Sequence, residues 1–166
     1  MFSRILVPTD FSPPSEAALE YARILAAKFG SSLRILHVID DPTASSDFVA
    51  DGFAPSTEDI RTSLLEQARK RLDDEMNRVD RTRYHAQADA VLGMPAASIV
   101  DYATATAAGL IVMGTHGRTG LAHLLMGSVA EQVVRTAPCP VLTVRQVTVT
   151  DELVGNVTDM RLAIAV

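Results

Sequence analysis

A glycine-rich segment follows a short apolar run in the C-terminal half of the chain. The run Leu110 to Met113 is followed by residues 114 to 127, which hold four glycines, and then by Ser128. Because glycine has no side chain, its backbone amides can lie close to a ligand. Ser128 precedes Glu131 by three residues, the spacing of a capping box, so a helix should begin at about Gly127 and Ser128. Glycine-rich backbone in front of a helix N-terminus is a common phosphate-binding arrangement, and we expect that chemistry here.

The spacing of these glycines matches neither of the common phosphate-binding motifs. A Walker loop requires a Gly-Lys pair, which the chain lacks, and the dinucleotide motif Gly-x-Gly-x-x-Gly is absent too. The alternative is that Gly114 and Gly117 only permit a tight turn after the apolar run. The glycines of the segment are Gly114, Gly117, Gly120 and Gly127, and Gly120, outside the spaced motif, is interpreted as structural.

Other polar residues could contribute to the same site or only support the fold. Asp10, in the stretch Pro8-Thr9-Asp10 after the first apolar run, could bind a ligand or only cap the helix that follows. Arg118 could meet a phosphate or be an exposed loop residue. His37 lies within an apolar run and is interpreted as a structural histidine. Cys139, between two prolines, is expected to be a buried, unreactive thiol. His85 and His123 have no partners at metal-ligand spacing, so no metal site made by protein side chains is expected.

The elements that must position these residues alternate along the chain. Helix signals are Ser12 before Pro13 at the first helix start and Gly30 at its end. Apolar runs predict strands, and apolar residues at helical spacing predict helices. The predicted strands are Ile5 to Val7, Leu33 to Ile39, Tyr84 to Leu92, Leu110 to Met113 and Val141 to Val144. The predicted helices are Pro13 to Phe29, Glu58 to Val79, Pro95 to Ala107 with Gly109 closing it, and Ser128 to Thr136.

Strict alternation of strands and helices predicts an α/β fold with a parallel sheet covered by helices on both faces. Ligands of such sheets bind beyond the carboxyl ends of the strands, where the strand order reverses. Two segments are candidates for that place: residues 8 to 10 after the first strand, and residue 114 onward after the fourth.

Composition limits the class of protein. A chain of 166 residues fits one domain. No apolar stretch approaches the roughly 20 residues of a membrane span, and the first ten residues lack the features of a signal peptide. A single cysteine fits a reducing compartment, so we expect a cytoplasmic protein with no membrane insertion. The net charge of -5 argues against a nucleic-acid binder.

Two long segments carry distinctive motifs: ILVPTDFSPPSEAALEYA, residues 5–22, and GTHGRTGLAHLLMGSVAEQVVRTAPCPVLTVR, residues 114–145. Both resemble the universal stress protein family, and its ATP-binding branch in particular. The resemblance covers about residues 1–145 and leaves residues 146–166 as a C-terminal extension. It implies a flavodoxin-like (Rossmann-like) three-layer sandwich whose five parallel strands have the order 3-2-1-4-5.

The resemblance also implies a binding site for ATP, which Mg²⁺ could accompany. Residues after the first two strands, with Met113, would surround the base and ribose, and Asp10 would hydrogen-bond the base. Residues of the glycine segment and the following helix start would hold the phosphates. The implied site residues are Pro8, Thr9, Asp10, Val38, Met113, Gly114, Gly117, Gly127, Ser128 and Val129, and Arg118 beside the phosphate loop is added as a candidate.

The function that follows is a cytoplasmic, nucleotide-dependent regulatory module in the stress response, which meets protein partners not identified by the sequence. Family members commonly form homodimers through the fifth strand, here Val141 to Val144, and we expect residues 141–166 to add contacts in a dimer or a higher oligomer. Within the extension, Val147 to Val149 could prolong the fifth strand or form another, and Leu162 to Val166 is apolar enough to pack. The alternatives are a slow ATPase or self-phosphorylating enzyme, a binder of AMP or another adenine nucleotide, and an interaction module without nucleotide.

Overall fold

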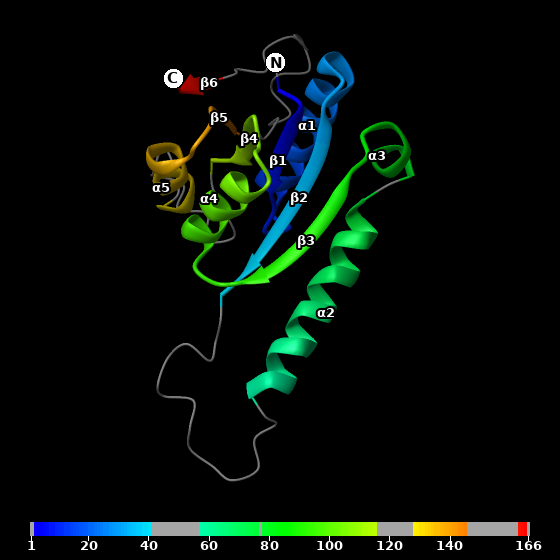
Figure 1. Cartoon of the computed structure of the whole chain (residues 1–166), viewed down its shortest axis with the longest axis vertical. Coiled ribbons are helices and arrows are strands. Elements are labelled where there is room, and N and C mark those ends of the chain that lie inside the picture. The colour runs from blue at the N-terminus through cyan, green and yellow to red at the C-terminus, as the bar shows by residue number, and fades with distance from the viewer. Residues whose placement is uncertain (1, 41–56, 77, 116–127, 146–162, 166) are drawn as a thin grey trace, which may run out of the picture.

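The computed structural model describes residues 2–40, 57–76, 78–115, 128–145 and 163–165. Strands and helices alternate through most of these residues, as the sequence predicts (Figure 1). The strands are β1 (Arg4–Pro8), β2 (Ser32–Ile39), β3 (Gln87–Leu92), β4 (Leu110–Gly114), β5 (Val141–Val144) and β6 (Ala163–Ala165). The helices are α1 (Pro13–Phe29), α2 (Thr57–Glu75), α3 (Arg78–Arg83), α4 (Pro95–Ala105) and α5 (Ser128–Thr136).

The strands form one sheet with the order β3-β2-β1-β4-β5-β6. The pairs among β1 to β5 are parallel, which confirms the predicted flavodoxin-like order 3-2-1-4-5. Strand β1 lies between β2 and β4, with Ile5 beside Leu33 on one side and Leu110 on the other. The chain therefore reverses its direction of winding at β1, and the carboxyl ends of β1 and β4 border the expected ligand crevice.

Two apolar cores lie on opposite faces of the sheet. Ile5 and Val7 pack with α1 and α2, whereas the intervening Leu6 packs with α4 and α5. This alternation follows from the strand period of two and confirms the three-layer sandwich (Figure 1). In the described part of the chain, no helix has both the length and the apolar character that a membrane span requires.

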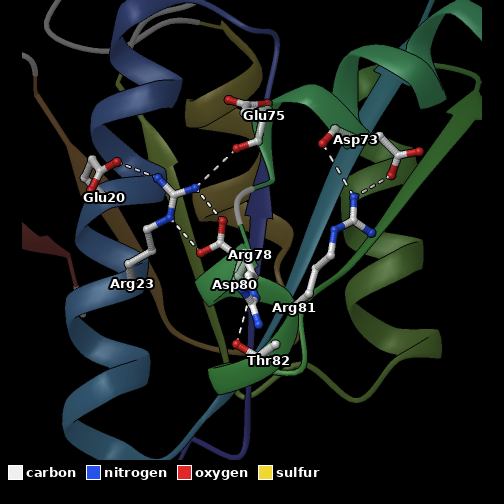
Figure 2. Close-up of polar contacts among 8 residues, drawn as sticks. All are labelled: Glu20, Arg23, Asp73, Glu75, Arg78, Asp80, Arg81 and Thr82. Atoms are coloured by element: carbon white, nitrogen blue, oxygen red, sulfur yellow. Dashed lines mark hydrogen bonds and ion pairs between the residues drawn. The ribbon is translucent and has the colours of Figure 1, made fainter.

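The helix predicted over Glu58 to Val79 is wrong in its C-terminal part. Helix α2 ends at Glu75, and the short helix α3 follows. The break has a tertiary cause, because Asp80 of α3 is fully buried and its carboxylate receives two hydrogen bonds from Arg23 of α1 (Figure 2). Tyr84, predicted to open the third strand, is instead a buried residue ahead of β3.

The helix caps are partly as predicted. Helix α1 has Ser12 as its N-cap and Pro13 as its first residue, and it ends at Gly30 in the left-handed conformation. Helix α4 ends at Ala105, earlier than predicted, and Ala107 rather than Gly109 adopts a positive φ, at 49°. Gly109 has a different role, because a Cβ there would lie 3.2 Å from Phe2 Cα.

The C-terminal extension contributes a sixth strand. Strand β6 pairs antiparallel with β5, and Leu142 lies opposite Ile164. Residues 147–149, Leu162 and Val166 lie outside the described residues. Strand β6 occupies the edge of β5 through which the resemblance implies dimer pairing, so two copies could pair there only after β6 is displaced.

Candidate functional site

A pocket of about 540 Å³ lies at the carboxyl ends of β1, β2 and β4, where the strand order reverses. This volume is in the usual range for small-molecule sites. Helices α4 and α5, with Ser15 of α1, contribute further lining residues. The lining residues are Pro8, Thr9, Asp10, Ser15, Leu36, His37, Val38, Ile39, Asp40, Pro95, Ile99, Met113, Gly114, Thr115, Ser128, Val129 and Ala130.

The structure brings together the predicted site residues that it describes, since every one of them lines this pocket. They are Pro8, Thr9, Asp10, Val38, Met113, Gly114, Ser128 and Val129. Gly117, Arg118 and Gly127 lie outside the described residues, as does Gly120. Nine further lining residues were not predicted from the sequence. Most of them adjoin predicted residues and could have been found from those, namely Leu36, His37, Ile39, Asp40, Thr115 and Ala130. Ser15 of α1 and Pro95 and Ile99 of α4 could not, because no motif connects them with the site.

The loop between β1 and α1 forms the polar side of the pocket. Thr9 is buried, and its amide donates to the Leu36 carbonyl at 2.8 Å. The Thr9 carbonyl accepts from Nδ1–H of His37 at 2.7 Å, and Thr9 Oγ1 lies 3.1 Å from Ser15 Oγ. The predicted structural role of His37 is therefore confirmed by its bond to Thr9, although its ring also borders the pocket. The loop is anchored to both β2 and α1.

Asp10 both lines the pocket and supports the start of α1. Its Oδ1 accepts from the Ser12 amide at 3.1 Å and from the Ser12 hydroxyl at 2.5 Å. The helix-start alternative for Asp10 is therefore present in the structure. A carboxylate can accept several hydrogen bonds, so the same group can also receive an N–H from a ligand.

Phe11, the next residue, has a φ of 61°. For an aromatic residue this left-handed conformation costs about 1–3 kcal/mol and persists only where the surroundings impose it. The Phe11 amide donates to Thr9 Oγ1 at 3.0 Å, which stabilises the turn. Such strain is concentrated at ligand sites in proteins, and here it adjoins the pocket carboxylate.

Gly114 has a packing role that the sequence did not predict. A Cβ at this position would lie 2.9 Å from the carbonyl carbon and the oxygen of Pro14 in the first turn of α1. The missing side chain therefore permits a close approach of α1 to the end of β4. This role differs from the tight-turn alternative, and it shapes the pocket because Gly114 also lines it.

The other end of the pocket is the start of α5. This helix of nine residues begins at Ser128, as predicted, and Ser128, Val129 and Ala130 line the pocket. The first amides of a helix have no intrahelical acceptor and carry a partial positive charge, so they attract an anion. Glu131 is ion-paired with Arg135 at 2.8 Å, one turn along the same helix.

The pocket combines apolar walls with few polar groups. Leu36, Ile99 and Met113 are buried side chains from three different elements. The same pocket is also lined by Asp10 and by the first residues of α5, so it offers apolar surface together with a carboxylate and a helix N-terminus. Cys139 is only half-buried, and its partial burial raises the pKa of its thiol, which favours the unreactive protonated form.

Comparison with known proteins agrees with this geometry. The sequence profile described as the Universal stress protein family matches residues 1–145. The chain is 35% identical over 146 residues to Universal stress protein MJ0531 of Methanocaldococcus jannaschii, an alignment that covers 88% of this chain and 84% of that protein.

Several solved structures are similar to this one. The hypothetical protein MJ0577, from the same organism, superimposes with a TM-score of 0.75 at 29% identity, covering 89% of this chain and 99% of its own. A universal stress protein in complex with cAMP superimposes with a TM-score of 0.54 at 26% identity, covering 87% and 97%.

Proposed function

This chain belongs to the universal stress protein family, and on that premise we propose that it binds an adenine nucleotide, ATP with Mg²⁺, in the pocket between β1, β2, β4 and α5. The observation that carries the proposal is the position and lining of this pocket. It lies at the reversal of strand order, and each predicted site residue within the described chain borders it.

The residues have distinct proposed roles. Pro8, Thr9 and Asp10 border the adenine and ribose, and Asp10 accepts a hydrogen bond from the base. Val38 contacts the base through its backbone, and Met113 forms the pocket floor. These roles suit an apolar ring with a polar edge, which is the chemistry of the walls.

The phosphates are proposed to lie at the glycine-rich side. Gly114, Gly117 and Arg118 adjoin the ribose and phosphates, and Gly127, Ser128 and Val129 hold the phosphates at the start of α5. Within the described residues, no cluster of three or more His, Cys, Asp or Glu side chains is placed to hold a metal ion. We therefore propose that the phosphates themselves carry the Mg²⁺.

At the level of the whole protein, we propose a cytoplasmic, nucleotide-dependent regulatory module of the stress response. Residues 1–145 form the nucleotide-binding domain, and residues 146–166 form an extension that takes part in assembly. The module forms a homodimer and meets protein partners rather than nucleic acid. Since β6 covers the edge of β5, dimer formation through β5 requires β6 to leave its own chain.

A second candidate ligand is a single-phosphate adenine nucleotide, AMP or cAMP. The structural neighbour in complex with cAMP favours this candidate. Slow ATP hydrolysis is a third outcome. Efficient phosphoryl transfer requires a strong cationic clamp, and the one candidate in the glycine segment is Arg118.

The test is to purify the protein under native conditions, identify any bound nucleotide by mass spectrometry, and measure thermal unfolding with Mg-ATP, AMP and cAMP. A ligand at 100 times its dissociation constant stabilises the folded state by about 2.7 kcal/mol. We expect a clear rise in Tm with Mg-ATP. A larger rise with AMP or cAMP would favour the second candidate, and a Tm unmoved by millimolar concentrations of all three would contradict the proposal.

A further inference from the structure

The turn that carries Asp10 has a conformation that its own sequence does not favour. Phe11 adopts a φ of 61°, in the region that favours glycine. Asp10 lies between Thr9 and Phe11. The Phe11 N–H donates a hydrogen bond to Thr9 Oγ1 across it. Phe11 also separates Asp10 from Ser12, whose amide and hydroxyl hold the Asp10 carboxylate, so the conformation at Phe11 affects where this carboxylate lies in the pocket.

Contacts from two other elements hold Phe11 in this conformation. The centroid of its ring lies 4.5 Å from that of the His37 ring on β2, with the two planes at 48°. On α2, the guanidinium carbon of Arg71 lies 4.1 Å from the centroid of the Phe11 ring, which is a cation–π contact. The His37 contact is reinforced because the same imidazole donates to the Thr9 carbonyl.

Arg71 differs from the other residues of this group in its location. Its side chain is exposed on α2, and it is not among the residues that line the pocket. Arg71 can therefore act on a bound ligand through Phe11, or through its positive charge, which also lowers the pKa of the nearby Glu75. The adjacent Lys70 is exposed and carries the same charge on the same helix, so it controls for the loss of one positive charge from α2, whereas Arg71→Lys keeps a charge beside Glu75.

We propose that Arg71 is a positioning residue for the pocket, which holds Phe11 in its left-handed conformation from α2 and thereby fixes Asp10 for the ligand. The proposal rests on the proposed function for the identity of that ligand. Its consequence is a coupling between α2 and the pocket: a displacement of α2 from the loop lowers ligand affinity, and a bound ligand strengthens the seating of α2 by the same factor.

The test compares Arg71→Met with Lys70→Met. Each variant removes one positive charge from α2, and methionine retains most of the aliphatic stem. In the protein without ligand, NMR measures the hydrogen-exchange rates of the Phe11 and Ser12 amides, both of which donate hydrogen bonds within the turn. We expect these two amides to exchange faster in Arg71→Met and at the wild-type rate in Lys70→Met. Equal exchange in all three proteins would overturn the proposal, whether or not the protein binds a nucleotide.

The second measurement is calorimetric titration with Mg-ATP. We expect about three- to tenfold weaker binding in Arg71→Met, which corresponds to most of one cation–π contact, and wild-type affinity in Lys70→Met. Arg71→Lys keeps a cation and should restore part of the loss. If the wild-type protein binds Mg-ATP and both methionine variants bind equally well, the positioning role is wrong. If the wild-type protein does not bind, the proposed function fails, and the exchange rates still decide the role of Arg71 in the loop.

Discussion

Arg23 of α1 donates two hydrogen bonds to the carboxylate of Asp80 on α3, from Nε to Oδ1 at 2.8 Å and from Nη2 to Oδ2 at 2.6 Å (Figure 2). The Asp80 side chain is fully buried, and only 16% of the Arg23 side chain is exposed. The same guanidinium reaches the Glu75 carbonyl at 3.4 Å and the exposed carboxylate of Glu20. Arg23 therefore fixes the junction between α2 and α3 against α1.

Replacing Arg23 by Met should destabilise the protein by about 3 kcal/mol, because it leaves a buried carboxylate without its guanidinium partner. The free energy of unfolding in urea measures this loss. The matched control is Arg81→Met, which breaks the exposed ion pair with Asp73 and should cost less than about 1 kcal/mol. Equal losses in the two variants would mean that the Arg23 pair contributes no more than a surface pair.

Glu75 should make the stability of the protein depend on pH. Both of its carboxylate oxygens are buried, and this burial, together with the negative charge of Glu16, raises the pKa of Glu75 despite the opposing charges of Arg23 and Arg71 and the neighbouring Thr9 hydroxyl. A carboxyl whose pKa is raised on folding stabilises the folded state while it is protonated, and this contribution is lost as pH rises through the folded pKa.

Glu75→Gln removes this titration and keeps the shape of the side chain. We expect the variant to be more stable than the wild-type protein at pH 7.5, and this advantage should shrink toward pH 4, where the wild-type carboxyl is protonated in both states. Urea unfolding at the two pH values gives the comparison. An advantage of the same size at both pH values would argue against a raised pKa. Glu131→Gln, on the exposed face of α5, is the control.

Gly114→Ala should weaken both the fold and the pocket. The new Cβ would lie 2.9 Å from Pro14 backbone atoms, which cannot give way like a flexible side chain, so we expect a cost of about 1–3 kcal/mol and a shift of α1. Gly30→Ala is a useful comparison. Its Cβ meets nothing within 4 Å, and its cost of about 1–2 kcal/mol comes only from its φ of 68°. Of the two variants, only Gly114→Ala should also lower nucleotide affinity, and an unchanged affinity would remove Gly114 from the site.

Asp10→Asn should lower nucleotide affinity with little effect on the fold. Asparagine keeps an oxygen that can accept the Ser12 amide but loses the charge and one acceptor. A hydrogen bond to a charged group contributes about 1.5–3 kcal/mol, so we expect about 10- to 100-fold weaker binding in calorimetry. Asp101→Asn, on an exposed position of α4, changes the net charge equally and should bind as the wild-type protein does. Equal affinity of Asp10→Asn and wild type would mean that Asp10 only supports the start of α1.

The sequence predicts the fold well wherever local chemistry decides it. The cap at Ser12 and Pro13, the left-handed Gly30 and the apolar runs are local signals, and the strand order followed from the family resemblance. The end of α2 could not be predicted, because its charged amphipathic pattern continues past Glu75 and the break depends on the bond between Arg23 and Asp80, 57 residues apart. The strand β6 was not predicted either, because a run as short as Ala163 to Ala165 has no periodicity of its own.

The candidate site, like the fold, could be predicted only where local sequence signals or the family resemblance indicate it. Asp10 and Gly114 could be named because parallel strands bring their carboxyl ends to one edge, whereas Met113 was named from the family resemblance alone. The packing reason for Gly114 could not be predicted, because it depends on how closely Pro14 of α1 approaches the end of β4. The strained φ of Phe11 and its contact with Arg71 are also tertiary properties, and no pattern in the sequence indicates them.

If a nucleotide occupies the pocket between β1, β4 and α5, the methyl group of Met113 should report its binding. With isotope-labelled methionine methyl groups, Mg-ATP should shift the Met113 signal in a saturable way, because this buried side chain lines the pocket. The signal of Met76, buried in the core on the opposite face of the sheet, should stay in place. A Met113 signal that does not move at millimolar Mg-ATP, AMP or cAMP would mean that none of these nucleotides occupies the pocket.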